Sequence, residues 1–223
     1  GRGPDPVDSL EILPMNFLAH LHLARPEPIS RLGNLLGDFV RGRPDDRFSP
    51  EIWRGIMHHR YLDAFTDSHA AWKLSRARLS PERVRFAGIV VDVFYDHFLS
   101  RHWDRFATDD ESLADFIDHC HRDLESAAPL GPAEASEVIT VMERQGWLAS
   151  YIELAGIDEA MQRISRRTPR LGPIATAIVD LERHYDELEA DFLAFYPDAL
   201  RQSSWLHERA EAGESLDFSA PVS

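Results

Sequence analysis

The chain of 223 residues lacks several features that would assign it to a familiar class. Cys120 is its only cysteine, so no disulfide can form within the chain, which is typical of a reducing compartment. The longest apolar stretches, such as residues 86–91, are far shorter than the ~20 residues of a membrane span. The start has no basic segment followed by an apolar one and a cleavage site. These absences predict a cytoplasmic protein with no membrane span.

Acidic residues outnumber basic ones, and nearly all of the positive charge is guanidinium. The formal net charge is −14, and Lys73 is the only lysine. Such an acidic balance argues against a general nucleic-acid binder, which normally presents a basic face. The arginines nevertheless gather in residues 76–85 and 163–170. This grouping indicates either a compositional bias or local capture of phosphate or carboxylate groups.

Common catalytic signatures are missing as well. The sequence contains no G-x-S-x-G elbow, Walker loop, G-x-G-x-x-G after a strand or H-E-x-x-H. It also shows no internal repeat and no strong strand pattern, while 43% hydrophobic residues suffice for a core. We therefore predict an all-α, single-domain helical bundle over residues 15–208. Residues 1–14 are interpreted as an extension or cloning remnant and 209–223 as a flexible tail.

Helix start signals are frequent along the chain. Ser49-Pro50-Glu51 and Ser80-Pro81-Glu82 each combine a capping hydroxyl, a proline at the first helical position and an acid near the positive end of the dipole. Ser30 is another candidate cap. A stripe of apolar residues from 174 to 195 indicates one long helix. We expect helices near 16–24, 31–41, 50–68, 81–104, 110–127, 132–145, 158–167 and 173–196, and one beyond Pro197.

The predicted helix 81–104 carries acids in an almost wholly apolar setting. Residues 86–99 are apolar nearly all round, yet they include Asp92, Asp96 and His97. Asp92 and Asp96 lie about 40° apart around a helix. Buried carboxylates side by side repel each other, and a divalent cation between them would relieve the repulsion. The alternative is that one acid pairs with an arginine and the other is exposed at a helix end.

The predicted helix 50–68 carries a second polar pair inward. Ile52, Ile56, His59 and Asp63 fall within about 60° of one another, with Asp67 just beside them. The isoleucines indicate that this face is buried. His59 and Asp63 are then either a satisfied core pair or two ligands of a metal ion.

Two shorter apolar segments also contain polar side chains. His20 and His22 lie among leucines, and Asp38 follows an apolar turn. Each signal is weak alone, because a single histidine on an apolar face is more often structural. Cys120 stands between two histidines, but neighbours at i−1 and i+1 on a helix point apart, which argues against zinc there.

Several blocks of sequence share the pattern of one known family. They are MNFLAHLHLA (15–24), GNLLGDFVRG (33–42), GIMHHRYLD (55–63) with Thr66-Asp67, DVFYDHFLSRHW (92–103), SRRTPRL (165–171) and LERHYDELEADFLAFY (181–196). In this order they resemble bacterial acyl carrier protein phosphodiesterases. The resemblance extends from Met15 to about residue 203.

This resemblance implies an all-α fold related to HD-domain phosphohydrolases and a divalent cation, manganese or else magnesium. It implies hydrolysis of the phosphodiester that joins 4′-phosphopantetheine to a serine of holo-acyl carrier protein. The acidic charge and the short apolar stretches predict neither nucleic acid nor membrane as partner. An HD domain usually has adjacent His-Asp. Here the adjacent pair is Asp96-His97, whereas His59 precedes Asp63 by four positions.

The resemblance and the helical phases together suggest roles for individual residues. We expect metal ligands among Asp38, His59, Asp63, Asp92, Asp96 and His97. We expect His20 to transfer a proton or support a ligand, and Arg60 and Arg41 to neutralise phosphate. We expect Arg163, Arg166, Arg167 and Arg170 to bind the acidic carrier protein. The alternatives are a phosphohydrolase acting on a small phosphate ester or nucleotide, and a non-catalytic helical domain that binds the carrier protein.

Overall fold

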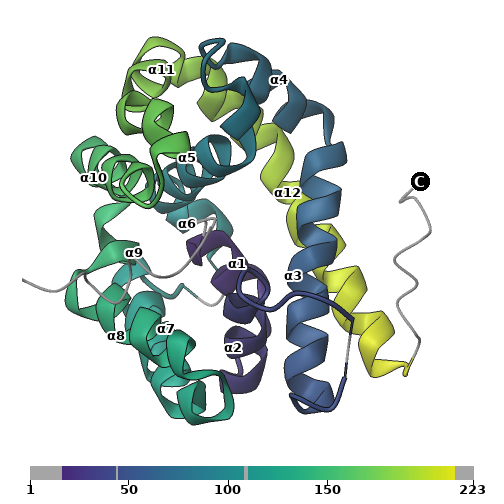
Figure 1. Ribbon diagram of the computed structural model, residues 1–223. Coiled ribbons are helices and arrows are strands. Elements are labelled where there is room, and N and C mark those ends of the chain that lie inside the picture. The colour runs from purple at the N-terminus through teal and green to yellow at the C-terminus, as the bar shows by residue number, and fades with distance from the viewer. Residues whose placement is uncertain (1–16, 44, 108–109, 214–223) are drawn as a thin grey trace, which may run out of the picture.

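The computed structural model describes residues 17–43, 45–107 and 110–213, and every regular element in these ranges is helical (Figure 1). The predicted all-α class is therefore confirmed. The α-helices are α1 (Phe17–Leu23), α2 (Pro28–Leu36), α3 (Pro50–Ser68), α4 (Ala70–Arg78), α5 (Ala87–Arg101), α6 (Trp103–Phe106), α7 (Leu113–Ala127), α8 (Ala133–Arg144), α9 (Trp147–Ser150), α10 (Leu154–Ser165), α11 (Ile178–Arg183) and α12 (Tyr185–Glu211). Three 3₁₀ segments accompany them: η2 (Val84–Phe86), η3 (Ala128–Leu130) and η4 (Pro169–Thr176).

The expected terminal segments are only partly covered by this description. Residues 1–14 and 214–223 lie outside the described residues. Helix α12 continues to Glu211, three residues beyond the predicted end of the domain. Among the described helices, none combines the length and the apolar character required to cross a membrane.

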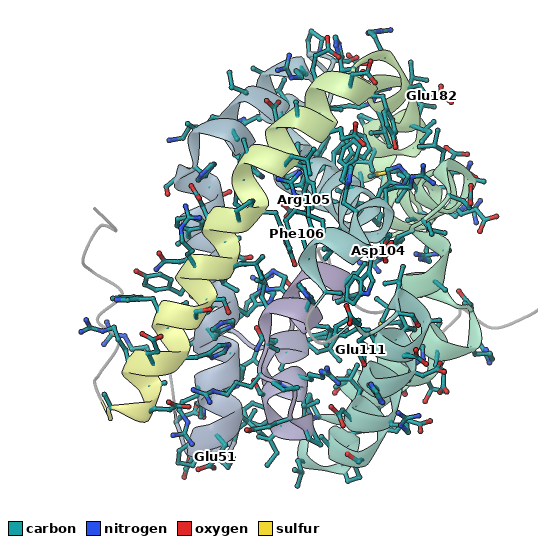
Figure 2. The ribbon with its side chains drawn as sticks, turned by 180° about the vertical axis from the view of Figure 1, so that it is seen from behind. Glu51, Asp104, Arg105, Phe106, Glu111 and Glu182 are labelled. Atoms are coloured by element: carbon teal, nitrogen blue, oxygen red, sulfur yellow. The ribbon has the colours of Figure 1, made fainter. Side chains whose placement is uncertain are left out.

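Helix α2 lies in the lower half of the view, between α3 on one side and α7 on the other (Figure 1). The long helix α12 packs along α3 and α4 and crosses the back of the molecule (Figure 2). Phe106 of α6 lies next to α12, where its ring meets those of Phe192 and Tyr196 edge-on, with centroids 5.8 and 5.0 Å away. One continuous apolar core therefore joins all of these helices.

The crossing of α2 and α3 depends on two glycines. A Cβ atom at Gly33 would lie 2.6 Å from the carbonyl oxygen of Ile52 and 2.7 Å from the Cα of Gly55. A Cβ atom at Gly55 would in turn lie 2.7 Å from the Cα of Gly33. Packed interiors leave no room for such an addition. The two backbones therefore meet directly, and the chain that leaves α2 lies against the middle of α3.

Helix α1 has only seven residues, and distant segments hold both of its ends. The main-chain N–H groups of Leu18 and Ala19 donate to the two carboxylate oxygens of Asp96 on α5, at 3.0 and 2.9 Å. First-turn N–H groups have no partner inside a helix and form the positive end of its dipole. At the other end, the Ser203 hydroxyl of α12 donates to the carbonyl oxygen of Leu23 at 2.7 Å. The register of α1 is therefore set by α5 and α12.

Most predicted helices exist, but several predicted starts are wrong. The hydroxyl of Ser80 caps no helix, because it and the Ser80 main-chain N–H both bond the buried carboxylate of Asp180. The predicted helix 81–104 is consequently replaced by η2, α5 and α6. Ser30 accepts from the N–H of Arg25, and α2 begins earlier, at Pro28. Helix α3 begins as predicted, with Ser49 accepting from Ile52 N.

In the C-terminal half, the helices are interrupted and continued at other positions than predicted. The expected helix 173–196 is divided among η4, α11 and α12, with a break at His184. Pro197 lies inside α12 and does not start a new helix. Helix α4 was not predicted, because only one residue, His69, separates it from α3; the ring of His69 caps it by accepting from Ala71 N at 3.2 Å.

Candidate metal centre

Four polar side chains converge where α1, α3 and the end of α2 meet. His59 Nε2 lies 3.1 Å from both Asp38 Oδ1 and Asp63 Oδ2, and His20 Nε2 lies 3.2 Å from Asp63 Oδ1. The two imidazole rings stack, with centroids 3.8 Å apart. We call His20, Asp38, His59 and Asp63 the His/Asp cluster. The structure thus brings together three of the predicted ligands and the histidine that was expected to assist them.

The surrounding backbone fixes the position of the His59 ring. A Cβ atom at Gly37 would lie only 2.2 Å from His59 Cγ, so the glycine makes room for the imidazole. The side chains of His20, Asp38 and His59 are 6%, 3% and 2% exposed, whereas that of Asp63 is 47% exposed. The cluster is therefore closed to solvent except on the side of Asp63.

The pKa values within the cluster reflect strong coupling. Burial disfavours the charged form of His59, but Asp63 and Asp38 outweigh burial and raise its pKa well above the ordinary value. Burial, and next the neighbouring His59, lower the pKa of His20. Burial acts to raise the pKa of Asp63, yet His59 and His20 hold it below its ordinary value. The positively charged ring of His59 therefore lies between the carboxylates of Asp38 and Asp63 and stacks on the ring of His20.

This donor set fits a divalent cation. Ligand atoms of His20, His59 and Asp63 all lie within 4.8 Å of one another. The single Nε2–H of His59 is shared between two carboxylates, and the stacked ring of His20 cannot also become charged without repulsion. A cation in place of that proton could be held by His20, His59 and Asp63, the three residues whose ligand atoms come together. Imidazole and carboxylate donors without thiolate suit manganese or magnesium.

The open side of the cluster leads to an acidic cavity of 190 Å³. Its lining residues are Asp63, Thr66, Asp67, Gly88, Ile89 and Asp92. Burial, and then the charges of Asp63 and Asp67, raise the pKa of Asp92 well above its ordinary value. Asp92 and Asp63 therefore line the same cavity, as predicted, and Asp67 adds a third carboxyl group to its wall.

Asp96 and His97 do not belong to this site, so both predictions must be corrected. The two oxygens of Asp96 accept the α1 N–H groups described above, although burial still raises its pKa. His97 Nδ1–H donates to the carbonyl oxygen of Tyr151 at 2.8 Å, and its Nε2 accepts from the Tyr185 hydroxyl at 2.9 Å. Asp92 and Asp96 lie on the same side of α5, as expected. The start of α1 covers Asp96, however, and its main-chain N–H groups bind the Asp96 carboxylate.

The arginines proposed to neutralise phosphate have different positions. The guanidinium of Arg60 donates to the carbonyl oxygens of Val40 and Gly42, the latter at 2.7 Å, and so holds the loop that follows Asp38. Its donors face the main chain, which differs from the expected phosphate contact. Arg41 is exposed on that same loop.

The four arginines of residues 163–170 do not form one surface. Arg166 and Arg170 are exposed, whereas Arg163 and Arg167 are half-buried. The second arginine group is also divided: Arg78 binds Asp191 at 2.9 Å, and Arg83 binds Asp180 at 3.1 Å. Neither group is therefore the continuous basic patch that the sequence suggested.

Some contributors to the site were not predicted. Gly37 was missed, although a glycine directly before a candidate ligand was an available signal. The half-burial of Arg163 and Arg167 carried no such signal, because it depends on how α10 and the residues after it pack on the rest of the chain.

Comparisons with known proteins agree with the earlier resemblance. A family described as "Acyl carrier protein phosphodiesterase" matches residues 15–199. The acyl carrier protein phosphodiesterase of Yersinia enterocolitica is 44% identical over 189 residues, which cover 85% of this chain and 97% of the relative. That of Photorhabdus laumondii is 40% identical over 183 residues (82% and 92%), and that of Escherichia coli is 37% identical over 190 residues (85% and 98%). No solved structure matches the chain, so the relation to HD domains stays a prediction.

Proposed function

The chain belongs to the acyl carrier protein phosphodiesterase family, and from this premise we propose that it removes 4′-phosphopantetheine from holo-acyl carrier protein. The observation that carries the proposal is the His/Asp cluster, because all four of its residues lie within the matched region 15–199. The substrate would be the holo carrier protein, and the place of action the cytoplasm, where carrier protein and enzyme would meet.

We propose that the cluster holds a divalent cation, manganese or else magnesium. His20, His59, Asp38 and Asp63 would supply two neutral and two negative ligands, which balance the charge of the ion. His20, expected to transfer a proton or support a ligand, would on this geometry be a ligand itself. A bound cation of this kind polarises a phosphoryl oxygen and makes a water molecule easier to deprotonate.

The reaction itself is a hydrolysis at phosphorus. A water oxygen forms a bond to phosphorus and gives up a proton, the bond from phosphorus to the serine oxygen breaks, and the serine oxygen takes up a proton to restore its hydroxyl. Asp63 is the cluster residue that faces the open cavity, so the phosphodiester would enter on its side. The acids that line this cavity repel a phosphate unless they are neutralised, which supports the need for a cation.

The direct test uses holo-acyl carrier protein, the protein and Mn²⁺, and follows the intact mass of the carrier protein. We expect the mass of the phosphopantetheine group to be lost, and we expect chelation of Mn²⁺ to stop the loss. An unchanged carrier protein would contradict the proposal. Turnover of a small phosphodiester in that case would favour the small-ester alternative, and a folded, metal-free, inactive protein would favour the carrier-protein binder.

A further inference from the structure

The segment that joins α2 to α3 carries Asp38, and side chains of α3 hold this segment in place. Asp38 lies just after the end of α2, and its buried carboxylate lies 3.1 Å from His59 Nε2. The described residues of the segment, 37–43 and 45–49, form no regular helix. The position of the Asp38 carboxylate therefore depends on what fixes the segment against α3.

Arg60 attaches the segment to α3 directly beside the His/Asp cluster. Its guanidinium donates to the carbonyl oxygens of Val40 and Gly42, the latter at 2.7 Å. Val40 follows Asp38 by two residues, and Arg60 follows His59 by one. A guanidinium presents its donors in a rigid fork, so two bound carbonyl groups fix both the place and the direction of the segment. Short stretches of backbone therefore connect both Asp38 and His59 to this one side chain.

Two further side chains extend the attachment along α3. The indole N–H of Trp53, two turns before Arg60, donates to the carbonyl oxygen of Asp45 at 2.8 Å. Arg47 donates to the carbonyl oxygen of Arg41 at 3.1 Å. The guanidinium carbons of Arg47 and Arg60 lie 5.7 and 5.9 Å from the centre of the Trp53 ring, within the range of cation–π contact. The helix that supplies two cluster residues thus also holds the segment that supplies a third.

Four roles of Arg60 differ in their effect on a bound cation. A phosphate contact would leave the affinity for a metal ion unchanged when no phosphate is present. A purely electrostatic role would weaken cation binding, because like charges repel. A role in packing alone would lower the stability and leave the metal affinity unchanged. Only a role in holding Asp38 strengthens cation binding in the absence of substrate.

We propose that Arg60 is a positioning residue, which holds the Asp38 carboxylate beside His59 and thereby strengthens binding of a divalent cation in the His/Asp cluster. This inference rests on the proposed function, since it concerns the cation site on which that function depends. Groups that orient the ligands of a metal ion without touching the ion typically contribute about 10–100-fold to its affinity. Arg60→Lys keeps the positive charge and loses the fork, so it separates geometry from charge.

Calorimetric titration of the metal-free protein with Mn²⁺, without phosphate or substrate, measures this effect. We expect Arg60→Lys and Arg60→Gln each to weaken Mn²⁺ binding by about tenfold or more, although the glutamine variant removes a charge that repels the ion. Arg54→Gln is the matched control, because Arg54 is exposed on the same helix and pairs with Glu51 at 3.1 Å. We expect it to change the affinity by less than about twofold.

Urea unfolding with Mn²⁺ chelated shows whether each variant is folded, and Arg60→Lys decides the case if Arg60→Gln unfolds. Wild-type Mn²⁺ affinity in a folded Arg60→Lys variant would overturn the positioning role, as would an equal loss in Arg54→Gln. Tighter binding by Arg60→Gln would overturn it too, because the guanidinium would then act through its charge.

The outcomes also separate this inference from the proposed function. If the wild-type protein binds no Mn²⁺, the role of Arg60 fails, whereas loss of phosphopantetheine from holo-acyl carrier protein under chelation would leave the hydrolysis itself standing. If the wild-type protein binds Mn²⁺ and leaves holo-acyl carrier protein intact, the proposed function fails. The titration series still decides whether Arg60 supports the cation site.

Discussion

Asp92 and Asp96 are four residues apart on α5, yet their surroundings differ, so that they contribute differently to stability. Asp96 stabilises the start of α1 through two main-chain N–H groups. Asp92 faces the acidic cavity, where burial and like charges raise its pKa. One and the same substitution should therefore have different effects at the two positions.

The Asp96→Asn variant should be less stable than the wild type by about 1–3 kcal/mol, because an amide has one oxygen for two buried N–H groups. Asp92→Asn should leave the stability unchanged or raise it, because it removes a crowded acid from the cavity wall. Urea unfolding of both variants without metal measures the difference. Equal stability losses would show that Asp96 has no special capping role.

Asp63 offers the cleanest test of cation binding at the level of one side chain. It is half-exposed, so Asp63→Asn should fold, while losing one of the two cluster carboxylates. A ligand present at 100 times its Kd stabilises the folded state by about 2.7 kcal/mol. We expect Mn²⁺ to raise the unfolding temperature of the wild type and to raise that of Asp63→Asn much less. An equal rise in both proteins would exclude Asp63 as a ligand.

At the scale of elements, the α2–α3 crossing decides whether the cluster can form. Gly55→Ala would press a methyl group against the backbone of Gly33, so the helices must separate. We expect a loss of about 1–3 kcal/mol in stability, as for an overpacked core, and a loss of Mn²⁺ binding with it. Gly172→Ala is the control, because a Cβ atom there meets nothing within 4 Å. Thermal unfolding measures the stability of both variants. Equal unfolding temperatures would contradict the importance of the close α2–α3 crossing.

Helical phase correctly predicted which side chains of one helix lie together, but it could not predict which other helix covers them. The phase of α3 correctly placed His59 and Asp63 side by side, although only His59 is buried and Asp63 remains half-exposed. The same reasoning grouped Asp96 with Asp92, because it could not foresee that α1 would lie over Asp96. Ser80 satisfied every local rule for a cap, yet it binds Asp180, which is 100 residues away. Local sequence gives no measure of such long-range competition for a polar group.

The distribution of charge over the whole molecule bears on how an acidic carrier protein can approach. On the back of the molecule, exposed Asp104 on α6 and Glu182 on α11 would repel such a partner, and Arg105 beside Asp104 is a single cation among them (Figure 2). Arg166 and Arg170 are exposed, whereas Arg163 and Arg167 on the same segment are half-buried. We therefore keep these two as the predicted contact with the carrier protein.

The double variant Arg166→Glu, Arg170→Glu should weaken binding of holo-acyl carrier protein and flatten its salt dependence, because steering between exposed charges is screened by salt. Hydrolysis of a small phosphodiester should stay unchanged. Arg122→Glu with Arg144→Glu, exposed on α7 and α8, is the charge-matched control. Similar losses in both double variants would show a general effect of net charge, with no docking site at Arg166 and Arg170.

The way α1 is held has a consequence for the order in which the molecule is assembled. His20 reaches its place only after Asp96 on α5 and Ser203 on α12 are in theirs, and these residues lie 78 and 180 positions from their partners in α1. Contacts of such long sequence separation form late and slow the folding of a chain. The bond from Ser203 cannot form until α12 has been synthesised, so we expect the position of α1, and with it the ligand set, to be completed only then. Synthesis therefore delays activity until the last helix closes over the first.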